Sequence, residues 1–169
     1  MGTTTKLLLP YPEPTAPVAN GADDIKALAN RIEARMPRGI VNVASVTTAQ
    51  GGFPTTPIAI ATSLTFTAEA GRLYEIAASI PIAIGSGATV AVGALIASGG
   101  IGTLTNGALA LPGNGVLGYL NLRWVGNMGA GARTITFTLQ ANAGTVTHNA
   151  APTAPSTISV ADLGPWPIT

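Results

Sequence analysis

The sequence predicts a mainly β protein, in which a β-sandwich or jelly-roll-like head follows an extended arm and one short α-helix. Short runs of alternating apolar and polar residues recur from residue 40 onward, separated by Gly, Pro and Asn, as in antiparallel sandwiches. A charged segment with helical periodicity comes before them. Because four prolines precede that segment, we divide the 169 residues into an arm at 1–19, a helix at 20–38 and a head at 39–169.

The arm is rich in proline and also carries large apolar side chains. Proline fixes φ and pushes the preceding residue toward extended backbone, so residues 1–19 are expected to be extended. Such a segment can bind along the sheet edge of another protein, and a frayed terminus is the alternative interpretation. We expect docking, because four large apolar side chains exceed what a free linker needs. These are Leu7, Leu8, Leu9 and Tyr11.

Residues 20–38 are predicted to form one amphipathic helix. Asn20 suits the N-cap and Asp23 the reciprocal position of a capping box, whereas Pro37 and Gly39 end the helix. The apolar stripe, which follows the i, i+3, i+4 and i+7 spacing of one helix face, consists of Ile25, Leu28, Ile32 and Met36. A helix of this length is marginal alone, so the stripe is expected to pack on the head or on copies of itself.

The head is predicted to contain seven or eight short strands. The segments with strand periodicity are 40–47, 63–68, 71–84, 88–96, 116–125, 133–142 and 156–163. Alternation places Leu64 and Phe66 on one face, and Tyr74, Ile76 and Ile80 in a second register. A hairpin turn is expected at 69–71, where Glu and Ala precede Gly.

Charged residues make up 9% of the chain, against about 25% in ordinary soluble domains. Six of them lie beyond residue 39, and the net charge of +1 provides no electrostatic footprint for nucleic acid. Because so little charge does little to keep copies apart, we expect a homo-oligomer. The uncharged stretch at 76–97 has the length of a membrane span. Glycines at 85 and 87 interrupt it and no Lys or Arg cluster flanks it, so no membrane insertion is expected.

No residue pattern predicts an enzyme, a cofactor or a metal site. The G-x-G-x-x-G spacing at 113–118 is interpreted as a hairpin turn, because a strand rather than a helix is expected to follow it. His148 is the single histidine, and its segment is typical of a solvated strand end. A triad of His148, Asp162 and a serine would lack the sharp turn that exposes such a nucleophile.

The remaining carboxylates and the aromatic residues are interpreted as structural. Glu69 is expected in a turn, and Glu75 is expected to pair with Arg72 on the surface. Neither is expected to join Asp162 in an acid pair for glycoside cleavage. The large aromatics expected to pack in the core or between subunits, rather than to form a sugar-binding platform, are Tyr119, Trp124 and Trp166. Trp166 stands between two prolines and is expected to act as a plug at the chain end.

Two stretches carry a family resemblance. The segment "LLLPYPEPTAPVANGADDIKALANRIEARM" and, after the β-rich middle, "VADLGPW" resemble small virion proteins of tailed phages of actinobacteria. Such proteins are described as minor tail proteins, or as head fibre or capsid decoration proteins. The resemblance covers residues 6–38 and 157–166, and the middle matches in style alone.

The resemblance implies a virion protein on the exterior of the tail or capsid. It implies a homotrimer whose arm is tied to another virion protein, with the β head projecting toward a glycan or protein of the host surface. The trimer comes from the resemblance, because Ile and Leu at the a and d positions favour two strands in simple coiled coils. Three functions stay open: a minor tail or fibre-like protein, a capsid head fibre or decoration protein, and a lectin-like glycan-binding module.

Overall fold

The computed structural model describes residues 2–3, 10–11, 21–113 and 115–166. Within them the chain forms one helix and twelve strands. The N-terminal elements are β1 (Gly2–Thr3), β2 (Pro10–Tyr11) and α1 (Gly21–Arg35). The head contains β3 (Gly39–Val46), β4 (Gln50–Phe53), β5 (Ile58–Ala68), β6 (Arg72–Ile84), β7 (Val90–Ala97), β8 (Gly102–Ala110), β9 (Leu117–Asn127), β10 (Gly131–Ala141), β11 (Val146–His148) and β12 (Ser156–Pro165).

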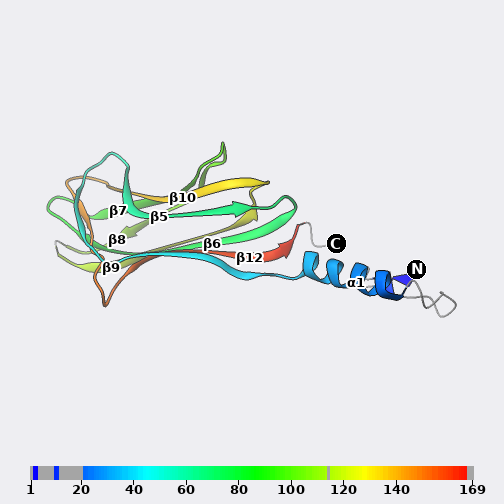
Figure 1. Ribbon diagram of the computed structural model, residues 1–169. Helices are drawn as coiled ribbons and strands as arrows, with labels where there is room; N and C mark the ends of the chain where they lie inside the picture. Colours follow the sequence, from blue (N-terminus) through cyan, green and yellow to red (C-terminus); the bar gives the residue numbers. More distant parts are fainter. Residues whose placement is uncertain (1, 4–9, 12–20, 114, 167–169) are drawn as a thin grey trace.

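The head consists of two antiparallel sheets that face each other (Figure 1). One, which we call the β7 sheet, has the order β5-β10-β7-β8. The other, the β6 sheet, places β9 on one side of β6, with β12 and β11 on its other side and β3 and β4 beyond them. The predicted class, a mainly β sandwich of the jelly-roll kind, is confirmed.

Successive strands mostly change sheets, as in a jelly roll. The connections β5–β6, β6–β7, β8–β9 and β9–β10 all cross between the sheets, whereas β7 and β8 pair directly. The hairpin turns predicted at 69–71 and at 113–118 are therefore wrong, because each connects strands of different sheets. The residues of a tight turn do not record which sheet the next strand joins; that choice depends on partners far along the chain.

The core lies between the two sheets and follows the alternation that the sequence predicts. Leu64, Phe66, Tyr74, Ile76 and Ile80 are all buried, and the rings of Phe66 and Tyr74 lie 5.3 Å apart. Burying one large apolar side chain stabilises a fold by about 1.5–3 kcal/mol. These two interior faces therefore provide most of the driving force for closing the head.

Three strands of the head were not predicted: β4, β8 and β11. β8 contains two glycines and pairs only with β7 at the edge of its sheet, so its alternation is weak and half of its side chains stay exposed. β4 and β11 are four and three residues long, shorter than periodicity can detect. β5 also begins five residues before the predicted strand, at Ile58.

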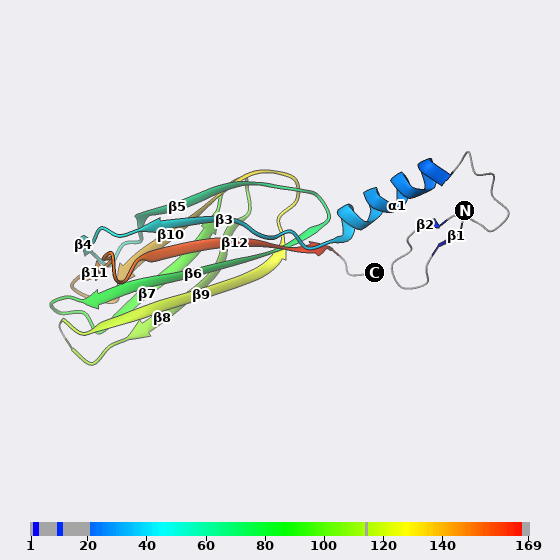
Figure 2. The ribbon, with the colours of Figure 1, turned by 60° about the horizontal axis from the view of Figure 1, so that its bottom comes forward.

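The helix α1 lies beyond one end of the head and continues the direction of β3 (Figures 1 and 2). It carries Asp23 and Asp24 in its first turn and Arg35 in its last, in the order that the helix dipole favours. The short strands β1 and β2 pair antiparallel, so these two described pieces of the arm run in opposite directions. The rest of the arm, which the sequence predicts to be extended, lies outside the described residues. In the part of the chain that the structure describes, no helix has the length and apolar content needed to cross a membrane.

Candidate functional site

The junction between α1 and the head is built around the buried side chain of Arg72, the first residue of β6. Its guanidinium Nη1 donates to the carbonyl of Ala34 at 2.9 Å, and Nη2 donates to the carbonyl of Met36 at 2.7 Å. Carbonyls at the end of a helix have no partner within the helix. Arg72 therefore caps the C-terminal end of α1 and ties it to the β6 sheet.

Asp162 on β12 completes this junction. Arg72 Nε donates to Asp162 Oδ2 at 2.5 Å, and the two residues are 4% and 1% exposed. The second carboxylate oxygen, Oδ1, accepts from the backbone N–H of Gly164 at 2.8 Å. Asn127 of β9 donates from Nδ2 to the carbonyl of Arg72. Three strands and the helix thus meet at one buried ion pair, whose geometry fixes how α1 leaves the head.

The apolar stripe of α1 does not pack on the head of its own chain. Ile25 is 64% exposed and Met36 is 56% exposed, Ile32 is also exposed, and Leu28 is half-buried. The sequence leaves two partners open for the stripe, the head and other copies of the helix. The structure shows that the stripe does not pack on the head of its own chain. Packing between copies stays a prediction.

The residues expected to anchor the arm are only partly described. Leu7, Leu8 and Leu9 lie outside the described residues, as does the expected N-cap Asn20. Tyr11 lies in β2, opposite Gly2 of β1, and β2 contacts α1. The anchoring role of these residues stays a prediction.

His148 is buried, so the predicted solvated strand end is wrong. β11 is sandwiched between β6 and β4, which places His148 in the interior with its Nε2 hydrogen-bonded to the hydroxyl of Ser156, itself buried. No described residue accepts or donates at Nδ1. Burial lowers the pKa of His148, because a charged imidazolium would lose its hydration.

This pair does not form part of a catalytic triad. Asp162 lies six residues farther along β12 than Ser156, which is about 20 Å at the rise of a strand, and its carboxylate is engaged by Arg72. The described residues contain no group of three His, Cys, Asp or Glu side chains that could hold a metal ion.

The other carboxylates form ion pairs between strands. Glu75 pairs with Arg123 of β9 through two hydrogen bonds of 2.8 and 2.7 Å, not with Arg72 as predicted. The side chains of residues 72 and 75 point to opposite faces of β6, which is why their short separation along the chain misleads. These hydrogen bonds lower the pKa of Glu75. Glu69 pairs with Arg38 on the surface.

The aromatic residues do not form a platform. Trp124 packs partly buried against the core, whereas Tyr119 is half-exposed on β9. Trp166 is 50% exposed and is held by its backbone N–H, which donates to the carbonyl of Gly71 at 2.6 Å. The predicted role of Trp166 as a plug is therefore wrong: the backbone of this residue, rather than its ring, closes the contact.

The chain matches no protein-family model and no curated protein. Among solved structures it is similar to Eiger TNF from S. frugiperda, with 12% identity, a TM-score of 0.51, and coverage of 76% of this chain and 95% of that chain. A CBM4 structure is 14% identical over 79% of this chain and 83% of that one, with a TM-score of 0.37. The VP2 subviral particle of infectious bursal disease virus is 14% identical over 76% and 38%, with a TM-score of 0.39. At these identities the first likeness shows the two-sheet fold alone, and the other two carry no argument.

Proposed function

We propose that this protein is a structural component of a phage virion. It is a homo-oligomeric minor tail or fibre-like protein that is attached by its N-terminal arm, with the β head projecting to contact the host surface. The observation that carries this proposal is that the two ends of the molecule differ in structure. The helix that follows the arm leaves one end of the head at an angle fixed by Arg72 and Asp162, and the loop-rich end points away (Figure 2).

A fixed helix is what a projecting protein requires. A flexible linker would let the head move freely over the particle, whereas the cap of Arg72 on the carbonyls of Ala34 and Met36 transmits the orientation of α1 to the head. The family resemblance of residues 6–38 supports the same assignment, because it covers the arm and this helix.

The exposed apolar stripe of α1 supports gathering of several copies at the base of the head. Ile25, Ile32 and Met36 are exposed in one chain, whereas an apolar stripe on a helix is normally buried against a packing partner. The resemblance favours three copies. Several arms on one oligomer would add avidity, so that individually weak contacts hold the protein on the particle.

The loops at the end of the head opposite α1 form an uncharged surface that could contact the host. Loops at this end brace one another, since Gly85 N–H donates to the carbonyl of Thr145 at 2.9 Å and Gly115 N–H donates to the carbonyl of Ile84 at 2.8 Å. The loop segments 85–89, 111–116, 142–145 and 149–155 contain no charged residue. Such a surface offers backbone groups and hydroxyls to a glycan or protein on the host.

Deletion of residues 1–17 tests the attachment. The truncated protein is expected to fold and to oligomerise as the full chain does, but to be absent from purified particles in quantitative mass spectrometry. A matched control replaces residues 1–17 by a Gly/Ser segment of equal length, which keeps the reach of the arm and removes its apolar side chains. Truncated protein present at the normal copy number would show that attachment lies elsewhere.

Imaging of particles that carry labelled protein tests the position. Label on the tail is expected, whereas label over the shell would support the head fibre or decoration alternative. A glycan-binding screen of the purified full chain addresses the lectin-like alternative, which predicts binding without any particle.

A further inference from the structure

We propose that copies of this chain associate through the outer face of the β6 sheet, the face turned away from the β7 sheet. This inference deepens the self-association in the proposed function and rests on it. The exposed large apolar side chains of the described head gather on the two edge strands of this sheet. Six of the ten lie on these strands: Ile40, Val41 and Val43 on β3, and Leu117, Tyr119 and Val125 on β9. Leu163 lies on β12, Val116 directly precedes β9, and Trp166 directly follows β12. Among the strands of the β7 sheet, Ile58 alone belongs to this class.

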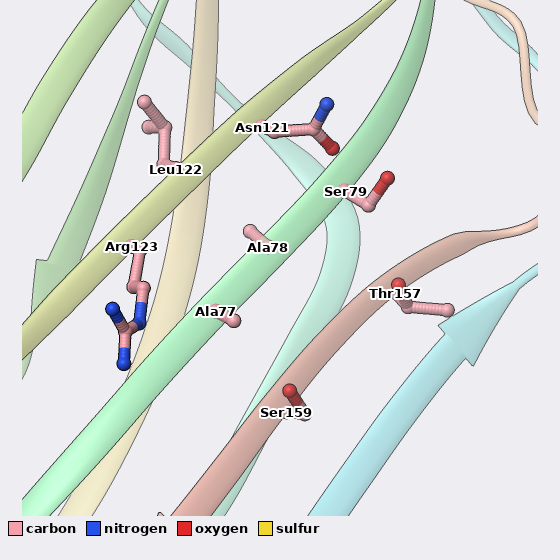
Figure 3. A pocket seen from close by; sticks show the side chains of 8 residues that line it. All are labelled: Ala77, Ala78, Ser79, Asn121, Leu122, Arg123, Thr157 and Ser159. Carbon is pink, nitrogen blue, oxygen red and sulfur yellow. The ribbon is translucent and has the colours of Figure 1, made fainter.

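The middle of the same face is hollow. Residues in cross-strand register form a row from Val43 on β3 through Ser159 on β12 and Ala77 on β6 to Arg123 on β9. The next row places Thr157 beside Ser79. Because these central side chains are small, they leave a depression of about 280 Å³ (Figure 3). Taller apolar side chains therefore stand along both edges of a shallow trough.

The charges on this face satisfy each other. Glu75 and Arg123 lie on neighbouring strands and form the bidentate pair described above, at 2.8 and 2.7 Å. A surface packed over them meets a closed pair rather than a free charge, which lowers the desolvation penalty. A strongly charged partner would find no unpaired charge of opposite sign in the rows between β3 and β9. An uncharged partner needs none, so it fits this face better.

The outer face of the β7 sheet lacks this character. Its central positions carry hydroxyls and amides that pair with one another, as in the contact of 3.1 Å between Thr65 Oγ1 and Thr134 Oγ1. It also contains a hollow of about 340 Å³, beside Ala94, Asn106 and Thr138. The two faces thus resemble each other in shape and differ in polarity, so association through the apolar edges singles out the β6 sheet.

The occupant that fits the trough is a second copy of this chain. The face contains both a raised apolar edge and a trough. The edge of one copy, at Val43, can therefore pack into the trough of the next copy, beside Ala77. The face spans about 19 by 33 Å, or about 600 Å², for four strands with a mean length of about ten residues. The stripe of α1, 15 residues long, adds about 200 Å² at about 1.5 Å per residue and about 10 Å of width. The total of about 800 Å² is what each partner of a standard interface buries.

The substitution Ala77→Lys tests the inference in the full-length chain. It places a charge in the trough of every copy, and Ala94→Lys is the matched control, since Ala94 is also a half-buried alanine in an inner strand beside a hollow. In light scattering at micromolar concentration, the wild type and Ala94→Lys are expected to have the same multiple of the monomer mass. Ala77→Lys is expected to have the monomer mass while keeping the β signal in circular dichroism.

A second variant covers the case in which Ala77→Lys does not fold. Val43→Lys lies on an edge strand, where the side chain is 51% exposed, and is expected to give the monomer as well. Folded variants that keep the wild-type mass would overturn this inference and leave the proposed function standing. Dissociation by Ala94→Lys to the same extent would also overturn it. A monomeric wild type would instead refute the self-association itself.

Discussion

Replacing Arg72 by Met removes the positive charge that joins α1 to the head and keeps most of the apolar volume of the side chain. Asp162, 1% exposed, would then be a buried carboxylate without its cation. Removing one partner of a buried ion pair costs about 3–5 kcal/mol. The carbonyls of Ala34 and Met36 also lose their donors, but they lie at the exposed end of a helix, where water replaces the bonds. We therefore expect a loss of about 3–5 kcal/mol.

Thermal unfolding followed by circular dichroism measures this loss. At about 2–4 °C per kcal/mol for a chain of this size, the Tm is expected to fall by about 10 °C. Arg123→Met is the control, because it removes an arginine whose ion pair is exposed (the arginine side chain is 67% accessible) and should change the Tm little. The double variant Arg72→Met/Asp162→Leu should regain part of the loss, because no charge then remains buried. Equal Tm values for Arg72→Met and Arg123→Met would refute the reasoning.

Three further predictions concern the interior of the head and the helix. His148 has a pKa lowered by burial, so below the unfolded value of about 6.5 the unfolded chain binds a proton that the folded chain excludes. The free energy of unfolding is therefore expected to fall between pH 7 and 5 in urea titrations, and His148→Leu should remove this dependence. Leu28→Asp is expected to weaken the oligomer in light scattering, because it puts a charge in the apolar stripe. Gly93→Ala is expected to destabilise by about 1–3 kcal/mol, since the new Cβ would lie 2.4 Å from Phe137 Cζ.

Each of these has a plain contrary outcome. Stability that is flat across this pH range would mean that His148 is hydrated in the folded state, because the chain has no other histidine. An unchanged oligomer mass for Leu28→Asp would remove the stripe from the contacts between copies. Gly93→Ala should be compared with Gly51→Ala, where the added atom meets nothing within 4 Å. Equal stability of the two would mean that the core around Phe137 relaxes freely.

The fold could be predicted from the sequence where the pattern is local. Alternation along β6 and β5 reports which side chains are buried, because a strand with one face on a core repeats every two residues. The helix could be recognised for the same reason, since its apolar stripe repeats at helical spacing. β8 was not predicted, because an edge strand with two glycines shows little alternation of apolar and polar residues.

The junction could not be predicted, because its partners are distant in the chain. Arg72 and Asp162 are 90 residues apart, and Glu75 and Arg123 are 48 apart. Nothing near Arg72 in the sequence distinguishes it from a surface arginine, and Glu75 three positions away is a more obvious partner. A signal was present in Asp162 alone, since an acid at an inward position of an apolar strand needs a buried partner.

The distance along the chain between α1 and β12 also determines when the two sides of the junction are synthesised. At about 5–20 residues per second, about 6–25 s pass between translation of Met36 and translation of Asp162. During that interval α1 has been synthesised while β12, which it packs against, has not, so the nascent helix has no set direction relative to the head. Only a chain completed through β12 presents the helix at the angle that Arg72 fixes. A prematurely ended chain carries the arm and the stripe without that angle, so under the proposed function it would be a poor building block for a particle with regular geometry.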